Sequence, residues 1–89
     1  MQKKTLTISN KLGLHARAAA RLVALTNKYP CKIELICKDR TVNGKSIMGV
    51  MMLAASIGSQ IDIVTDGEDE ITLLEELEKL IVNKFYENE

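Results

Sequence analysis

The stretch KIELICKDRTVN, residues 32–43, predicts two short strands joined by a turn. From 32 to 38 every second residue is apolar, which is the period of a half-buried strand. Asp39 and Arg40 can turn the chain into a short strand at 41–43. Two strands joined so closely pair in opposite directions, so we expect an antiparallel sheet.

The flanking segments show either the same strand period or the 3.6-residue period of helices. Pro30 closes the first helix, Ser46 caps the second, and Gly58 fits the far end of the second. The order of elements predicts one α+β domain with helices on one face of the sheet. The expected elements within this domain, 1–89, are strands at 3–9, 32–38, 41–43 and 60–65 and helices at 16–29, 47–53 or 47–55, and 69–85.

Each expected helix has an apolar stripe that can pack on the sheet. Aromatic residues make up only 3% of the chain, so the core must be aliphatic, and an aromatic platform for single-stranded nucleic acid is absent. The expected inward residues are Ala19, Leu22, Val23 and Thr26 in the first helix, Val50, Leu53 and Ala54 in the second, and Leu74, Leu77 and Ile81, flanked by Leu73 and Leu80, in the third.

Charge is distributed unevenly along the sequence although the net charge is zero. Residues 1–45 hold ten Lys or Arg and two Asp or Glu, whereas residues 46–89 hold two and ten. If the fold keeps these halves apart, the basic side would attract acidic proteins or phosphate. A nucleic-acid-binding domain would be basic overall, so we expect no nucleic-acid partner.

We expect a cytoplasmic protein that does not cross a membrane. Residues 1–10 lack the apolar run of a cleaved signal peptide, and the longest apolar stretch, 47–58, is too short to span a bilayer. Cys31 and Cys37 match no zinc or redox spacing, and we expect both to be buried free thiols. We therefore expect neither a metal nor a cofactor.

His15 is the only histidine, and it lies between the first strand and the first helix. The first amides of a helix lack partners within the helix and bind phosphate, so those of Ala16 and Arg17 are candidate phosphate ligands. The Arg17 guanidinium can add a charge-assisted hydrogen bond. A neutral imidazole is a nucleophile near pH 7, so His15 is a candidate phosphoryl acceptor. The alternative is an ordinary polar residue near a helix cap.

The second helix is apolar almost all round, because residues 47–55 read IMGVMMLAA. A short helix on one face of a small sheet cannot bury its whole circumference. With its inward stripe packed on the sheet, Ile47, Met48 and Met51 are exposed and form an adaptable docking surface. The alternative is that Met48, Met51 and Met52 fill gaps in the core.

Two segments resemble the signature segments of the HPr family, the histidine-containing phosphocarriers of the bacterial phosphotransferase system, including its nitrogen-related branch. They are NKLGLHARAA, residues 10–19, and VNGKSIMGVM, residues 42–51. The resemblance extends over nearly the whole chain. It implies an open-faced sandwich with a four-stranded antiparallel sheet in the order 1-4-2-3 and three helices on one face.

The same resemblance implies that His15 is phosphorylated on Nδ1 by enzyme I, which is itself charged from phosphoenolpyruvate. The phosphoryl group would then pass to an enzyme IIA component, with Arg17 assisting the transfer. In that role the chain is a covalent carrier and not an enzyme with a turnover of its own. The docking surface implied for these partners consists of Ala20, Arg21, Ile47, Met48 and Met51.

Ser46 occupies the position at which some family members are phosphorylated by a dedicated serine kinase, for which a phosphorylase is the counterpart. A phosphate there would place about two negative charges beside the docking surface and weaken transfer by repulsion. The alternative, a plain helix cap, is compatible with this role. A regulatory module that selects partners by the phosphorylation state of His15 or Ser46 is the second hypothesis, and a plain interaction domain is the third.

The sequence departs from the common family pattern at two positions. Many members carry proline directly after the arginine, where this chain has Ala18, which leaves an additional amide donor near the phosphate. Leu12 replaces a polar residue of some sugar-system members, so no side-chain hydrogen bond from this position to His15 is expected. The 10–13 loop and Ala18 resemble the regulatory branch. We expect a monomer, because a carrier exposes its histidine to two partners in turn.

Overall fold

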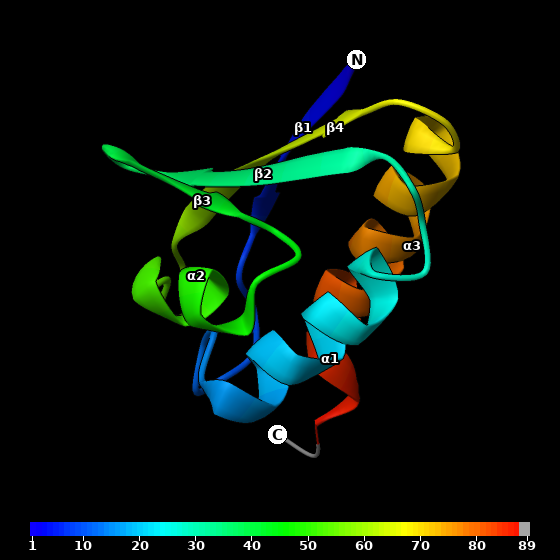
Figure 1. The fold of residues 1–89 in the computed structure, drawn as a ribbon. Helices are drawn as coiled ribbons and strands as arrows, with labels where there is room; N and C mark the ends of the chain where they lie inside the picture. The colour runs from blue at the N-terminus through cyan, green and yellow to red at the C-terminus, as the bar shows by residue number, and fades with distance from the viewer. Residues whose placement is uncertain (88–89) are drawn as a thin grey trace.

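A four-stranded antiparallel sheet forms one layer of the molecule and three helices form the other (Figure 1). The structure, a computed structural model, describes residues 1–87. The sheet order is β1-β4-β2-β3, so the expected α+β sandwich and its strand order are confirmed. The elements along the chain are β1 (Gln2–Thr7), α1 (Ala16–Thr26), β2 (Lys32–Cys37), β3 (Arg40–Asn43), α2 (Ile47–Met52), β4 (Gln60–Asp66), α3 (Glu70–Val82) and a 3₁₀ turn, η1 (Lys84–Tyr86).

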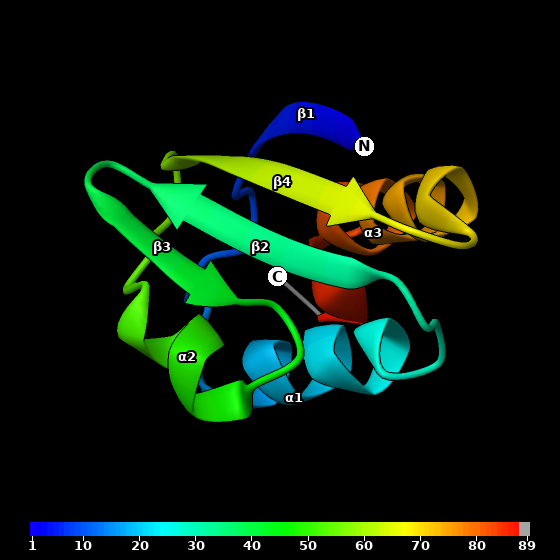
Figure 2. The same cartoon turned by 45° about the horizontal axis from the view of Figure 1, so that its top comes forward.

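β4 lies in the interior of the sheet and pairs with both β1 and β2. Leu6 of β1 lies opposite Ile61, and Leu35 of β2 lies opposite Ile63. All four side chains are buried, and Figure 2 shows the helices gathered on one face of the sheet. A shift of one residue would turn these side chains toward solvent, so the alternation of apolar and polar residues fixes the register.

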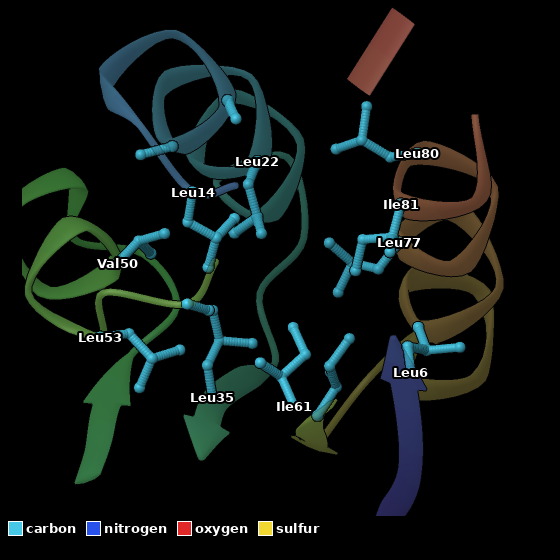
Figure 3. Close-up of a cluster of buried hydrophobic side chains, with 14 of the residues drawn as sticks. Leu6, Leu14, Leu22, Leu35, Val50, Leu53, Ile61, Leu77, Leu80 and Ile81 are labelled. Atoms are coloured by element: carbon cyan, nitrogen blue, oxygen red, sulfur yellow. The ribbon is translucent and has the colours of Figure 1, made fainter. Parts of the chain in front are cut away.

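A cluster of aliphatic side chains fills the space between the sheet and the helices (Figure 3). Leu22 of α1, Val50 of α2 and Leu77 of α3 all belong to it and are completely buried. Cys31 and Cys37 are buried free thiols, as the sequence predicts. The helices are therefore held in place by burial of apolar surface, and no covalent link is needed.

α1 ends at Thr26, earlier than the predicted end at Tyr29. The Thr26 hydroxyl donates a hydrogen bond to the Gly44 carbonyl at 2.7 Å. The side-chain amide of Asn27 donates to the Val23 carbonyl at 3.1 Å. These bonds satisfy groups at the helix end and join it to the segment that precedes α2.

α3 ends at Val82 rather than at the predicted Phe85. Residues 84–86 have φ values of +55°, +56° and +59°, and a right-handed helix cannot continue through left-handed residues. The buried stripe of α3 also differs from the prediction. Leu73 is completely buried, whereas Leu74 is only partly buried against the core.

α2 is stopped by Ala54 and not by the predicted Gly58. Ala54 has a φ of +55°, and its side chain is exposed, so its predicted place in the core is wrong. Ala55 is buried in its place. α2 has only six residues, and none of the helices among residues 1–87 is long and apolar enough to cross a membrane.

The basic first half of the chain and the acidic second half meet in the fold. Lys4 of β1 lies 2.6 Å from Glu78 of α3, and Lys3 lies 3.8 Å from Asp62 of β4. These ion pairs join the two halves of the sequence along β1.

Candidate functional site

His15 lies immediately before α1, and its ring does not cap the helix. Its backbone is extended, with φ −73° and ψ 178°, and the neighbouring Leu14 is buried and anchors the loop in the core. The imidazole is 27% exposed, so another protein can reach it. The predicted placement of the histidine at the start of the first helix is confirmed.

The first turn of α1 presents hydrogen-bond donors beside His15. Because the His15 side chain does not cap the helix, the amides of the exposed residues Ala16 and Arg17 are available to an anion. Arg17 is exposed, and no partner within residues 1–87 binds its guanidinium. An anion at this position would meet both the positive end of the helix dipole and a guanidinium.

Gly13 allows the loop before His15 to pack closely on the segment that follows α2. Its φ is +66°, and a Cβ at this position would lie 2.4 Å from the carbonyl oxygen of Ala55. The next residue, Leu14, donates its amide to the same oxygen at 2.9 Å. Only glycine combines a favourable positive φ with the absence of a Cβ that would clash with Ala55. Gly13 therefore sets the position of the histidine loop.

An exposed apolar surface lies on α2, which packs beside α1. Ile47, Met48, Met51 and Met52 are 43%, 68%, 39% and 64% exposed, and we call these four residues the methionine patch. The alternative in which the methionines fill the core is therefore wrong. Leu12 of the histidine loop is also 65% exposed, so apolar side chains are accessible on the loop as well as on α2.

The remaining predicted site residues lie on α1 and at the start of α2. Ala20 and Arg21 are exposed, but the guanidinium of Arg21 also donates to the carbonyl of Phe85. The hydroxyl of Ser46 accepts the amide of Gly49 at 3.0 Å, so the predicted cap of α2 is confirmed. Ser46 is partly exposed. No group of His, Cys, Asp and Glu side chains within 1–87 is arranged to hold a metal.

Comparison with known proteins identifies the family. The family described as "PTS HPr component phosphorylation site" matches residues 2–83. The chain belongs to the HPr family. The phosphocarrier protein HPr of Xylella fastidiosa (strain Temecula1) is 51% identical over 88 residues, which cover 99% of each chain. The protein is therefore an HPr phosphocarrier of the phosphotransferase system.

Solved HPr structures share the whole fold. The structure described as HPr-C-His from Thermoanaerobacter tengcongensis has a TM-score of 0.95 and 39% sequence identity, and covers 100% of both chains. An HPr dimer from the same organism has a TM-score of 0.78 and 40% identity, covering 98% of this chain and 100% of that one. The sandwich described above is thus the HPr fold.

One residue beside the histidine, Glu87, was not predicted from the sequence. The Nε2 atom of His15 is hydrogen bonded to Oε2 of Glu87, whose side chain is only 7% exposed. The side-chain amide of Asn10 donates to Oε1 of Glu87 at 2.9 Å and to the carbonyl of Gly13 at 2.7 Å. The match to the HPr family ends at residue 83, so this carboxylate lies outside the matched segment.

The left-handed turn η1 brings Glu87 back to the histidine. Left-handed φ values cost about 1–2 kcal/mol for each residue with a side chain, so such a turn persists only when its surroundings hold it. Phe85 at its centre is completely buried, and its carbonyl accepts the Arg21 guanidinium. The turn also contacts α1, as Figure 1 shows. Residues 84–87 are thus part of the His15 site.

Proposed function

We propose that this HPr accepts a phosphoryl group on His15 from phosphorylated enzyme I and passes it to an enzyme IIA component. The observation that carries the proposal is the uncapped start of α1 next to a ring that solvent reaches. The residues that follow His15 in the chain supply the first amides of α1 and the Arg17 guanidinium, which has no partner in residues 1–87, and both can bind a phosphate on the ring.

The transfer is a displacement at phosphorus. The lone pair of His15 Nδ1 forms the new phosphorus–nitrogen bond while the bond between phosphorus and the donor nitrogen of enzyme I breaks, and the donor keeps that electron pair. The Ala16 and Arg17 amides and the Arg17 guanidinium hold the phosphoryl oxygens. The second transfer is the same displacement, with a nucleophile of the acceptor attacking and His15 leaving.

The methionine patch, together with Ala20 and Arg21 of α1, is the surface that we assign to both partners. Methionine side chains are flexible and polarisable, so one patch can pack against two different proteins. The patch contacts protein partners, whereas the helix start contacts the transferred group. Changes in the methionine patch should therefore alter partner affinity, whereas changes at the start of α1 should alter chemical transfer.

The proposal is tested with radiolabelled phosphoenolpyruvate and enzyme I from the same organism. Wild type is expected to gain acid-labile label, and His15→Ala none. Arg17→Ala is expected to be labelled roughly tenfold more slowly, because it loses one charge-assisted hydrogen bond to the phosphoryl group. An unlabelled wild type, or label on His15→Ala, would contradict the proposal.

We assign Ser46 a second role as a regulatory site for a serine kinase and its phosphorylase. Its partial exposure supports this role, and its place at the start of the methionine patch means that a phosphate would meet any docked partner. We further propose that residues 1–89 act as one HPr domain in the cytoplasm, where buried free thiols such as Cys31 and Cys37 stay reduced.

We propose a monomer as the working state, because His15 and the methionine patch must be open to each partner in turn. Because an HPr dimer has been solved from Thermoanaerobacter tengcongensis, the oligomeric state of this chain has to be measured. Sedimentation at the concentration used for labelling is expected to give the mass of one chain. A dimer that transfers phosphate at full rate would contradict this assignment.

A further inference from the structure

We propose that Glu87 is a positioning residue that fixes the tautomer of His15, so that the proton is on Nε2 and the lone pair is on Nδ1. The consequence for phosphoryl transfer rests on the proposed function. The tautomer itself is a property of the unphosphorylated protein and is measured without any partner.

Each oxygen of the Glu87 carboxylate has a hydrogen-bond contact that orients it. Oε1 accepts from Asn10, and Oε2 contacts Nε2 of His15. If the side-chain amide of Asn10 were rotated by 180°, its oxygen would face the Gly13 carbonyl oxygen. Two acceptors cannot form a hydrogen bond, so the bond from Asn10 to Gly13 would be lost. Asn10 is completely buried, so water does not replace that bond cheaply. Asn10 therefore always presents a donor to Glu87.

An ionised carboxylate has only acceptor atoms, so its contact with Nε2 requires the imidazole to donate from that nitrogen. A neutral imidazole carries one ring proton, and when that proton is on Nε2 the lone pair is on Nδ1. The nucleophilic nitrogen is thus selected by a hydrogen bond on the opposite side of the ring. A carboxylate fixes the tautomer of histidine in the same way in metal sites and in the catalytic triads of enzymes.

Glu87 holds this position because the turn that carries it is anchored. Phe85 is buried in the core, and Arg21 donates to the Phe85 carbonyl. The left-handed residues of η1 would relax if these anchors were absent. The side chain of Glu87 is itself only 7% exposed, so its hydrogen bonds compete little with water. Arg21 therefore acts on the site through the backbone of the turn.

The carboxylate also matches the charge that appears during transfer. When Nδ1 bonds to phosphorus, the ring gains positive charge while Nε2 keeps its proton, so no proton has to leave the site. The hydrogen bond from Nε2 to Glu87 then joins a cationic ring to an anionic carboxylate, and such bonds are stronger than neutral ones. Glu87 thus favours the phosphorylated ring as well as the reactive tautomer.

The test replaces the carboxylate by an amide of nearly the same shape. In Glu87→Gln, the oxygen of the new amide must face the Asn10 donor, which leaves its NH₂ facing Nε2 of His15. An NH₂ group donates, so it requires a lone pair on Nε2 and moves the ring proton to Nδ1. The variant is therefore expected to reverse the tautomer with little change in the fold.

Nitrogen-15 NMR of the imidazole, recorded where the ring is neutral, reads the tautomer directly. We expect wild type and the control Glu75→Gln, an exposed residue of α3, to have the proton on Nε2. Glu87→Gln is expected to have it mainly on Nδ1. A wild-type ring protonated on Nδ1, or a Glu87→Gln ring still protonated mainly on Nε2 in a protein with native backbone shifts, would overturn the proposal.

Labelling kinetics with enzyme I give the second readout. Glu87→Gln is expected to lower the rate at saturating carrier by at least about tenfold while leaving the concentration for half-maximal rate unchanged, because the methionine patch is intact. Glu87→Asp, which restores an acceptor, is expected to recover part of the rate. An unlabelled wild type with the expected tautomer would contradict the proposed function alone, whereas normal labelling of Glu87→Gln would overturn the role of Glu87.

Discussion

The amide of Leu14 donates to the carbonyl oxygen of Ala55 at 2.9 Å, so the loop that carries His15 is hydrogen bonded to the segment that follows α2. This bond therefore connects the loop of His15 to the element that carries the methionine patch, although the two come from different parts of the sequence. A partner that docks on α2 meets the histidine in a position set by this bond and by the close approach of Gly13.

Gly13→Ala is expected to destabilise the protein more than Gly58→Ala. Both glycines have positive φ, which costs alanine about 1 kcal/mol. A Cβ at Gly13 would also lie 2.4 Å from the Ala55 oxygen, whereas a Cβ at Gly58 has no neighbour within 4 Å. We expect Gly13→Ala to lower the free energy of unfolding by roughly 3 kcal/mol and to slow labelling. Equal urea midpoints for the two variants would contradict the close packing.

Met48→Ala is expected to weaken partner binding without changing stability. Met48 is 68% exposed, so its removal should change the free energy of unfolding by less than about 0.5 kcal/mol. At a docking surface the same change should cost more than about 1 kcal/mol, a rise in Kd of roughly fivefold or more. Ile71→Ala, 58% exposed on α3, is the matched control. Titration calorimetry with enzyme I that gives equal Kd values for both variants would exclude the patch as the docking site.

Ser46→Ala and Ser46→Asp should separate the cap from the regulatory role. Loss of the hydroxyl that accepts from Gly49 is expected to cost about 1 kcal/mol of stability in Ser46→Ala, with transfer unchanged. Ser46→Asp keeps an acceptor and should be as stable as wild type, but its charge should weaken partner binding about tenfold. Thermal melts and transfer rates measure the two effects. Transfer at the full rate by Ser46→Asp would contradict the regulatory role and show that Ser46 acts only as a helix cap.

The stabilising contribution of ionised Glu70 should be lost in acid. Hydrogen bonds from the N-terminal amine, at 2.8 Å, and from the Gly67 amide, at 3.0 Å, lower the pKa of Glu70 from 4.5 to about 2. Between these two pH values the unfolded chain binds the proton and the folded chain does not, so the contribution is complete above pH 4.5 and lost as the pH falls toward 2. Melting temperatures should fall less steeply with acid in Glu70→Gln than in wild type or Glu75→Gln. Parallel curves would contradict this origin of the acid sensitivity.

The features that depend on local periodicity could be predicted from the sequence. The strands follow from alternation, the order of elements follows from their succession, and the exposure of Met48 and Met51 follows from a short helix that is apolar all round. The position of His15 before α1 follows from the change of period at Ala16. All of these are properties of neighbouring residues.

The features that depend on contacts between distant residues could not be predicted. The end of α1 at Thr26 involves a bond to Gly44, which is 18 residues away. Glu87 is separated from His15 by 72 residues and reaches it only through a left-handed turn of residues that usually avoid that conformation. No local sequence pattern predicts such a turn. A single histidine that lacks an evident partner in the sequence is the one signal that could prompt a search for a distant carboxylate.

Phosphorylation of His15 on Nδ1 is tested most directly by NMR of the ¹⁵N-labelled protein after reaction with phosphorylated enzyme I. We expect a phosphorus coupling to Nδ1 of His15 and large shifts of the Ala16 and Arg17 amides, because these amides then bind the phosphoryl oxygens. Phosphate on Nε2 or on another residue would contradict phosphorylation of Nδ1. Unshifted amides at the start of α1 would contradict the proposed phosphate-binding role of these amides.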